Sequence, residues 1–387
     1  MKVIERLTRQ CYGEPVDYVP VSQLCYALIL KSFAQCSELE FYLNPRLQID
    51  AKVAFQKRFP EIYNEQMGTF PEIGEFAGLI ATAFGGDMAW MPDAPPWVRV
   101  YPIKTVEDID RLVANGVPDV KKVGLGADYL KLIKYFWDWF PRDIREEYEY
   151  IDRNVYCGLL VEGAMLSMGY DKFFVWMYSY PKELHKWLDL ATRYFIEYCE
   201  AIEEILGDAK YIFIPDHSPA FVNESQFEEF ILPYLNRAFD KYQKCVKAGG
   251  WRFWHNEGSV KHIYKAVDKI NAEIWQVGAF DDMGDVKKFT HFCARGNLHP
   301  PGILQRGKPE EVAEATRQII FKAGEGGKLW LGGGGGIAPW TPLENLEAML
   351  IAAKKYGRYP LDKSLLDIPV ITKKEWLMGE TSQFGVM

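Results

Sequence analysis

The tripeptide His255-Asn256-Glu257 places an imidazole and a carboxylate at the end of the apolar run 250–254, and Gly258 follows it at once. In a β-strand, residues two apart point to the same side, so His255 and Glu257 are expected to face one space. Such a pair binds a metal ion or works as an acid and a base. The alternative is a core histidine that is hydrogen-bonded to Glu257 for structural reasons alone.

Apolar runs alternate with helical patterns over most of the chain. The segment 258–267 has helical spacing, as do 225–232 and 309–316. The runs expected to be strands are 154–158, 211–215, 251–255, 273–277, 296–298 and 328–331. Repeated strand–helix units predict an α/β fold with a parallel sheet and outer helices. Because no composition break divides them, we predict one (β/α)8 TIM barrel, with the chemistry at the carboxyl ends of its strands.

The first part of the chain, to about residue 70, is rich in helical patterns and has a short extended piece at 18–21. We expect it to be an N-terminal helical extension of a single domain that spans residues 1–387. The segment 91–97 is rich in turn-forming residues and predicts a loop.

Composition excludes several classes of partner. The 387 residues carry 45 basic and 53 acidic side chains, a net charge of −8 without long like-charge blocks, which argues against nucleic acid or an anionic membrane. No run of 18 apolar residues and no signal peptide is present, so a cytoplasmic location is expected. The seven cysteines are scattered and never form Cys-x-x-Cys, which predicts reduced thiols. The aromatic content of 15% suits either a cavity for flat ligands or core filling.

Polar residues after other expected strands are further site candidates. Asp216 and His217 follow one apolar run and are predicted to be catalytic, while His299 follows another and is a candidate metal ligand. Alternatives stay open: His299 can support the turn after it, Asp282 can cap a helix, and Glu162 can act as a general acid or as a cap.

A run of five glycines, Gly332 to Gly336, follows the last expected strand and is called the glycine run below. Such a loop brings backbone amides against a phosphate or leaves space for a bulky ligand. It contains no Lys, Ser or Thr, so a nucleotide P-loop is excluded. We expect Gly334, Gly335 and Gly336 to contact a cofactor; the alternative is a flexible or tightly turned loop.

Several stretches resemble the uroporphyrinogen decarboxylase superfamily. They are 218–221 with 226–235, 296–298 with 307–312, 336–339 with 341–345, and 96–98 with 104–112. The resemblance runs from roughly residue 70 to 358 and implies a TIM barrel. The superfamily contains decarboxylases of a tetrapyrrole with many carboxylates, and methyltransferases that exchange methyl groups with a corrinoid.

The decarboxylase branch fits this chain poorly. A decarboxylase resembling the family pattern carries an arginine-containing segment after Pro15-Val16, whereas the region 17–25 here has no arginine. A site for an octa-acid needs cations. The resemblance therefore favours the methyltransferase branch.

The thiol-methylating members of that branch hold zinc with a His-x-Cys pair and a later Gly-Cys-Gly cysteine. Here His255 matches the histidine, Glu257 the first cysteine and Gly335 the second, so both sulfur ligands are lost. A Zn²⁺ ion held by His255 and Glu257 keeps net positive charge and polarises an ether oxygen. The chain is therefore similar to the first methyltransferase of an anaerobic aryl methyl ether O-demethylase, because a phenolate, with a pKa of about 10 as for tyrosine, is a tolerable leaving group.

The resemblance also implies a partner. The chain lacks the Asp-x-His-x-x-Gly pattern of corrinoid-carrier domains, so cobalamin is expected to arrive on a corrinoid protein. The expected substrate is a small aromatic methyl ether of the guaiacol or veratrole type. The alternatives are another methyl donor or acceptor (methylamine, thioether or thiol), the decarboxylase activity, and a non-catalytic corrinoid-binding protein.

Overall fold

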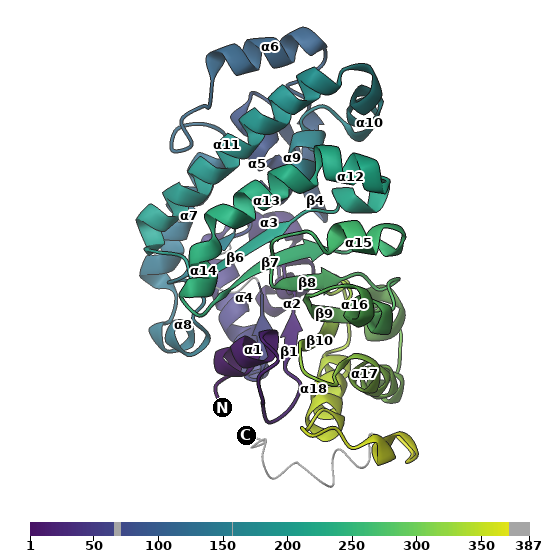
Figure 1. Ribbon diagram of the computed structural model, residues 1–387. Helices are drawn as coiled ribbons and strands as arrows, with labels where there is room; N and C mark the ends of the chain where they lie inside the picture. Colours follow the sequence, from purple (N-terminus) through teal and green to yellow (C-terminus); the bar gives the residue numbers. More distant parts are fainter. Residues whose placement is uncertain (66–70, 157, 371–387) are drawn as a thin grey trace.

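Eight parallel strands form the centre of the molecule (Figure 1). The computed structural model describes residues 1–65, 71–156 and 158–370. The strands lie in the order β2-β1-β10-β9-β8-β7-β6-β5, and each neighbouring pair is parallel. Their bounds are β1 Val21–Gln23, β2 Ile62–Asn64, β5 Asn154–Tyr156, β6 Tyr211–Pro215, β7 Trp251–Asn256, β8 Ile274–Val277, β9 Cys293–Leu298 and β10 Leu329–Gly333. The predicted TIM barrel is confirmed; Cys157, at the end of one predicted strand, lies outside the described residues.

The sheet ends at β2 and β5, and a side chain spans the space between them. Among the described residues, no backbone pairing joins these two strands. The hydroxyl of Tyr150 accepts a hydrogen bond from the backbone N–H of Asn64 at 3.2 Å, and its ring lies 5.1 Å from that of Tyr63. Tyr150, which precedes β5 in the chain, thus contacts β2.

Helices follow the strands and cover the outside of the sheet, with the long α11 running across one side of the molecule (Figure 1). The helices before β6 are α1 Val3–Cys11, α2 Ala27–Ala34, α3 Glu38–Leu43, α4 Pro45–Arg58, α5 Glu75–Ala83, α6 Val106–Asn115, α7 Gly124–Trp139, α8 Arg142–Tyr148, α9 Val161–Leu166, α10 Tyr170–Ser179 and α11 Pro181–Leu206. Those after it are η1 Ser218–Phe221, α12 Glu224–Phe230, α13 Leu232–Lys241, α14 Gln243–Lys247, η2 Lys261–Ile263, α15 Tyr264–Val267, α16 Met283–Phe289, η3 Pro300–Leu304, α17 Pro309–Ala323, α18 Leu343–Tyr356 and η4 Lys363–Leu366. This is the alternation expected from the sequence.

The first 65 residues contribute more than helices. Besides α1 to α4 they supply β1 and β2, two of the eight barrel strands. Only α1 precedes the barrel, so the helical extension is shorter than the predicted segment of about 70 residues, of which 66–70 lie outside the described residues. β1 begins at Val21, where the predicted extended piece ends.

The segment 87–100 forms a hairpin rather than the predicted loop. Its strands are β3 Asp87–Met91 and β4 Ala94–Val100, which pair antiparallel in a sheet of their own. Pro95 and Pro96 lie in β4, and a two-stranded sheet tolerates them because each strand has an unpaired edge. The turn-rich composition therefore hid a strand.

Alternate residues of β7 point into the barrel. Trp251 and Phe253 pack against Trp330 of β10 across the interior, with ring centroids 5.0 and 6.0 Å apart. Aromatic side chains thus fill the lower part of the barrel, as expected for a packed core. The next inward position, two residues on, is His255. Strand alternation therefore brings this imidazole to the carboxyl end of the barrel, next to the layer formed by Trp251, Phe253 and Trp330.

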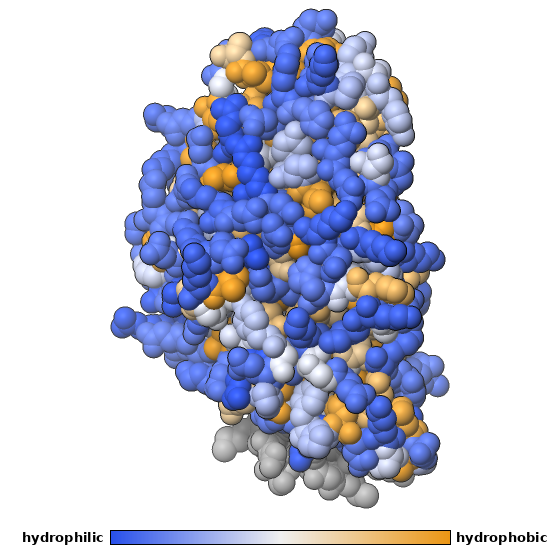
Figure 2. Space-filling view, in the orientation of Figure 1, coloured by the Kyte–Doolittle hydropathy of each residue, from blue (hydrophilic) through white to orange (hydrophobic). Residues whose placement is uncertain are grey.

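One face of the molecule is largely polar. Figure 2 shows one face on which hydrophilic side chains dominate and hydrophobic ones form small separate groups. Among the described helices, none has the length and apolar character needed to cross a membrane. Six cysteines are free thiols, and Cys157 lies outside the described residues.

Candidate functional site

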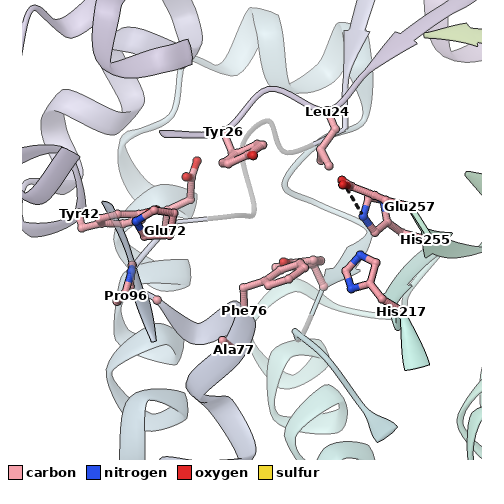
Figure 3. A pocket seen from close by; sticks show the side chains of 13 residues that line it. Leu24, Tyr26, Tyr42, Glu72, Phe76, Ala77, Pro96, His217, His255 and Glu257 are labelled. Carbon is pink, nitrogen blue, oxygen red and sulfur yellow. Dashed lines mark ion pairs between the residues drawn. The ribbon is translucent and has the colours of Figure 1, made fainter. Parts of the chain in front are cut away.

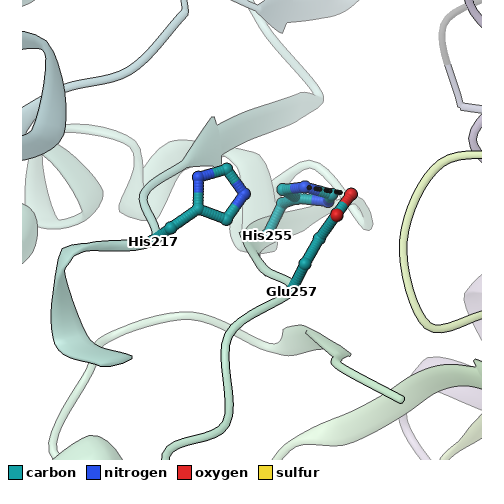
Figure 4. A group of neighbouring side chains, drawn as sticks. All are labelled: His217, His255 and Glu257. Carbon is teal, nitrogen blue, oxygen red and sulfur yellow. Dashed lines mark ion pairs between the residues drawn. The ribbon is translucent and has the colours of Figure 1, made fainter. Parts of the chain in front are cut away.

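Two neighbouring strands, β6 and β7, carry the polar side chains of the site. His217 follows β6, His255 lies in β7, and Glu257 follows β7. The possible ligand atoms of these three residues all lie within 4.8 Å of one another. His255 Nε2 lies 3.4 Å from Glu257 Oε1, and Figure 4 shows His217 beside this pair. His255 and Glu257 thus face one space, as strand alternation indicates, and His217 joins them.

His217 is oriented by Glu162 of α9. Its Nδ1 lies 2.7 Å from Glu162 Oε2, and its backbone N–H donates to the same oxygen at 2.9 Å. Tyr170 donates to the other oxygen of Glu162. Burial lowers the pKa of His217, but the charge and hydrogen bond of Glu162 outweigh this effect and raise it. With Nδ1 held in this way, Nε2 points toward His255 and Glu257 (Figure 4).

Glu257 is half-exposed, with 44% of its side chain accessible, and it is held by two contacts. Beside His255, it accepts a hydrogen bond from the backbone N–H of Gly336 at 3.0 Å. Burial opposes ionisation of Glu257, but the hydrogen bond and charge of His255 outweigh it and lower the pKa to about 2. The carboxylate is therefore ionised and available to a cation.

The glycine run is closely packed against this carboxylate. Gly335 has a φ of +146°, and a Cβ atom there would lie 2.6 Å from Cδ of Glu257 and 2.8 Å from both carboxylate oxygens. Any larger residue at Gly335 would displace Glu257. Gly334 donates its N–H to the carbonyl of Leu298 at 2.7 Å. The run thus serves to hold Glu257, and contact of Gly334, Gly335 and Gly336 with a cofactor stays a prediction.

Asp216, predicted to be catalytic, does not line the cavity. Its buried carboxylate accepts hydrogen bonds from the backbone N–H groups of Val161 at 2.6 Å, Glu162 at 3.0 Å and Ser218 at 3.1 Å. Burial and then the charge of Glu162 raise the pKa of Asp216 to about 6. This placement supports a structural role: Asp216 ties the end of β6 to the start of α9.

His299, predicted to be a metal ligand, is also placed elsewhere. Its Nδ1 accepts the N–H of Gly302 at 2.9 Å at the start of η3, and its ring contacts Phe280. It lies outside the group formed by the other three ligand candidates. Asp282 caps α16 by accepting from the N–H of Gly284 at 2.9 Å. In this structure His299 supports the turn that follows it and Asp282 caps a helix, which are the structural alternatives considered for them in the sequence analysis.

A cavity of about 280 Å³ opens beside the two histidines. Figure 3 shows His217, His255 and Glu257 on one side of it, with Tyr26, Tyr42 and Glu72 across from them. Its described lining consists of Leu24, Tyr26, Tyr42, Glu72, Gly74, Phe76, Ala77, Pro95, Pro96, Tyr156, His217, His255 and Glu257. Most of these residues belong to the first hundred positions and were not predicted as site residues. The only signal for them was the high aromatic content.

Comparison with known proteins places the chain in a family. The sequence pattern described as "Uroporphyrinogen decarboxylase (URO-D)" matches residues 156–356, more than half of the chain. The chain belongs to the URO-D family. The family resemblance inferred from the sequence is thereby confirmed.

Relatives in this family carry two kinds of name. A methylcobamide:CoM methyltransferase MtbA of Methanosarcina acetivorans is 25% identical over 91% of this chain and 97% of its own length. A uroporphyrinogen decarboxylase of Dictyostelium discoideum is 26% identical over 92% of this chain and 94% of its own length. A methyltransferase structure from Methanosarcina mazei superposes with a TM-score of 0.70 at 23% identity, covering 92% of this chain and 99% of that one. This last likeness supports the fold.

The three ligand candidates of this URO-D family member suit a divalent metal ion. Two imidazoles and one carboxylate form the ligand set of catalytic zinc sites that keep one position open for water or substrate. Glu162 would supply the outer carboxylate that orients a histidine ligand. Nδ1 of His255 is buried without a hydrogen-bond partner among the described residues. One polar atom of the site therefore lacks a partner that a bound group could supply. His217, His255 and Glu257 would hold the ion; no cysteine belongs to the group.

Proposed function

We propose that this chain is a corrinoid-dependent methyltransferase that removes the methyl group of an aryl methyl ether, of the guaiacol or veratrole type. The acceptor is Co(I) of a corrinoid carried by a partner protein, and the product is a phenol. One observation carries the proposal: His217, His255 and Glu257 lie at one side of a cavity lined by aromatic rings, and none of its described lining residues is Arg or Lys.

The decarboxylase activity named for some relatives fits the cavity poorly. A tetrapyrrole with many carboxylates needs several cationic side chains to bind it. The described lining instead includes two carboxylates, Glu72 and Glu257, and its volume of about 280 Å³ lies just below the usual range for ligand pockets. A small, flat and uncharged ligand suits it better.

The cavity walls would orient a methoxyarene. The ring of Phe76 lies 6.2 Å from that of His217 and 6.3 Å from that of Tyr156, and Tyr26 lines the cavity across from the histidines (Figure 3). Offset or edge-to-face contacts between aromatic rings are favourable. In the transfer the C–O bond breaks, the methyl group passes to the acceptor without the bonding electron pair, and the oxygen keeps that pair and takes up a proton. A Zn²⁺ ion, when bound, supplies the Lewis acid that stabilises charge on this oxygen.

A second candidate is methyl transfer to or from a thiol, which the name of the Methanosarcina acetivorans relative favours. Thiolate ligands suit zinc to that chemistry, whereas the ligand candidates that the described residues bring together are His217, His255 and Glu257, without a cysteine. The donor set therefore favours an oxygen leaving group over a thiol.

The test is an assay of methyl donors with the full chain. In the first arm, purified protein loaded with Zn²⁺ is mixed with Co(I)-cobalamin and a methoxyarene, a methylamine or a methyl thioether, and the formation of methylcobalamin is followed by absorbance. In the second arm, the same protein is mixed with methylcobalamin and a thiol, and the loss of methylcobalamin is followed. We expect formation from methoxyarenes, and a loss of orders of magnitude in Glu257→Ala at unchanged circular dichroism. Equal turnover with methylamines or thiols, or near-normal turnover in Glu257→Ala, would contradict the proposal.

A further inference from the structure

A buried carboxylate, Glu72, faces the cavity from the side opposite the three ligand candidates (Figure 3). Only 6% of Glu72 is accessible, although it lines the cavity. One oxygen accepts the N–H of Ala27 at 2.7 Å, and the other lies 3.2 Å from Nζ of Lys52. An ion pair is costly to bury, so its place in the wall of a ligand cavity invites a functional explanation.

The contacts of Glu72 fix its position. Burial raises the pKa of Glu72 above its ordinary value, and the Lys52 ammonium and the N–H of Ala27 limit this rise without reversing it. Gln48 accepts the N–H of Glu72 at 2.7 Å and donates to its carbonyl at 2.8 Å, so the backbone is held as well. Each carboxylate oxygen has two lone pairs, and the described residues supply one bond to each, which leaves room for a donor from the cavity.

The surroundings of the cavity are negatively charged on this side. Burial, and after it the charges of Glu257, Glu72 and Glu38, raises the pKa of the Tyr26 hydroxyl. Lys52 is fully buried behind Glu72 and does not line the cavity. A ligand on this side of the cavity therefore meets carboxylate oxygens and aromatic rings, and none of the described lining residues is Arg or Lys.

We infer that Glu72 is a specificity-determining residue that selects methoxyarenes bearing a hydroxyl group remote from the methoxy group and rejects those bearing a carboxylate. A phenolic hydroxyl donates to the lone pairs of Glu72 that face the cavity. A carboxylate there meets acceptor oxygens instead, because the Lys52 ammonium that pairs with Glu72 does not line the cavity. This inference rests on the proposed function for the place of the methoxy group, and it narrows the substrate class to uncharged methoxyphenols.

Binding measurements without a corrinoid test the inference separately from catalysis. The probes are para-methoxyphenol, para-methoxybenzoate and methoxybenzene, which differ only in the group opposite the ether, and calorimetry with the full chain gives Kd. We expect para-methoxyphenol to bind at least about tenfold more tightly than para-methoxybenzoate, and more tightly than methoxybenzene. Equal or tighter binding of para-methoxybenzoate would overturn the inference.

Variants assign the preference to Glu72. In Glu72→Gln the ratio between the phenol and the benzoate should fall to about threefold or less, because the like charge is removed. Glu273→Gln is the matched control, since Glu273 is paired with Arg252 at 2.8 Å but does not line the cavity; it should keep the wild-type ratio. If Glu72→Gln unfolds because Lys52 loses its partner, the double variant Lys52→Met/Glu72→Gln removes both charges. An unchanged ratio in the folded variant would overturn the inference.

The outcomes distinguish the two proposals. Selective binding of para-methoxyphenol without methyl transfer would refute the proposed function and leave the role of Glu72 intact. Methyl transfer from para-methoxybenzoate at the rate found for para-methoxyphenol would refute the role of Glu72 and leave the proposed function intact.

Discussion

Replacing Gly335 with alanine tests whether the glycine run holds a metal ligand. A Cβ atom at this position would lie 2.6 Å from Cδ of Glu257, closer than real Cβ contacts occur, so the carboxylate must move. The backbone φ of +146° adds a strain of about 1–3 kcal/mol for a non-glycine residue. The displacement removes one of three proposed ligands from its place.

The size of the effect follows from what such contacts contribute to metal binding. Loss of an outer contact that orients a ligand typically lowers metal affinity about 10- to 100-fold, and displacement of the ligand itself should cost at least as much. We therefore expect the Kd for Zn²⁺ to rise at least about tenfold in Gly335→Ala, equivalent to about 1.4 kcal/mol.

The assay is a Zn²⁺ titration of metal-free protein in competition with a chromophoric chelator. Gly85→Ala is the matched control, because Gly85 also has a positive φ, +96°, but no atom lies within 4 Å of its Cβ position. It should lose stability without a change in Kd. An unchanged Zn²⁺ affinity in folded Gly335→Ala would refute the reasoning that Glu257 is a ligand held by this glycine.

Three further predictions concern the same centre. Glu162→Gln removes the charge bound to Nδ1 of His217 and should weaken Zn²⁺ binding about 10- to 100-fold; an unchanged Kd would show that His217 is not oriented by it. Gln23→Met removes hydrogen bonds to the glycine run at 2.8 and 3.4 Å and should raise the Kd for Zn²⁺. The control is Gln56→Met, at a residue that is also buried, and it should lower Tm only. Equal shifts of the Zn²⁺ Kd in both variants would argue against a role of Gln23 in supporting the glycine run. Dialysis against a strong chelator should abolish methyl transfer, and added Zn²⁺ should restore it; activity that survives complete metal removal would contradict a metal-dependent step.

The positions of the later strands and of their carboxyl ends could be predicted from the sequence. Parallel strands buried on both faces appear as short apolar runs, and Tyr211–Pro215 is buried throughout. Alternation then placed His255 and Glu257 on one side without knowledge of the fold. The prediction for Asp216 rested on its position after a strand alone, and a position cannot tell whether a carboxylate points into a cavity or back to the amides of α9.

The residues of the opposite wall of the cavity could not be predicted from the sequence. Tyr26, Tyr42 and Glu72 lie about 180 residues or more before His255 along the chain, and only the closure of the barrel brings them across from it. β4 was missed for a different reason, because its Pro95 and Pro96 have the composition of a turn. Contacts between distant segments leave no local pattern, so the sequence indicated the side of the cavity that carries His255 and Glu257 but not the opposite wall.

Five consecutive glycines would ordinarily be chosen as a place to cut a chain, to insert a tag or to join a second protein. In this molecule the N–H groups of Gly333, Gly334 and Gly336 all donate to fixed partners, and the last of these partners is Glu257. An insertion within the run would shift the register of these donors and leave the carboxylate without its support. For protein engineers, the segment that looks most like a linker is the least suitable one for new termini, and the exposed turn at Gly326, with no atom within 4 Å of its Cβ position, is the better choice.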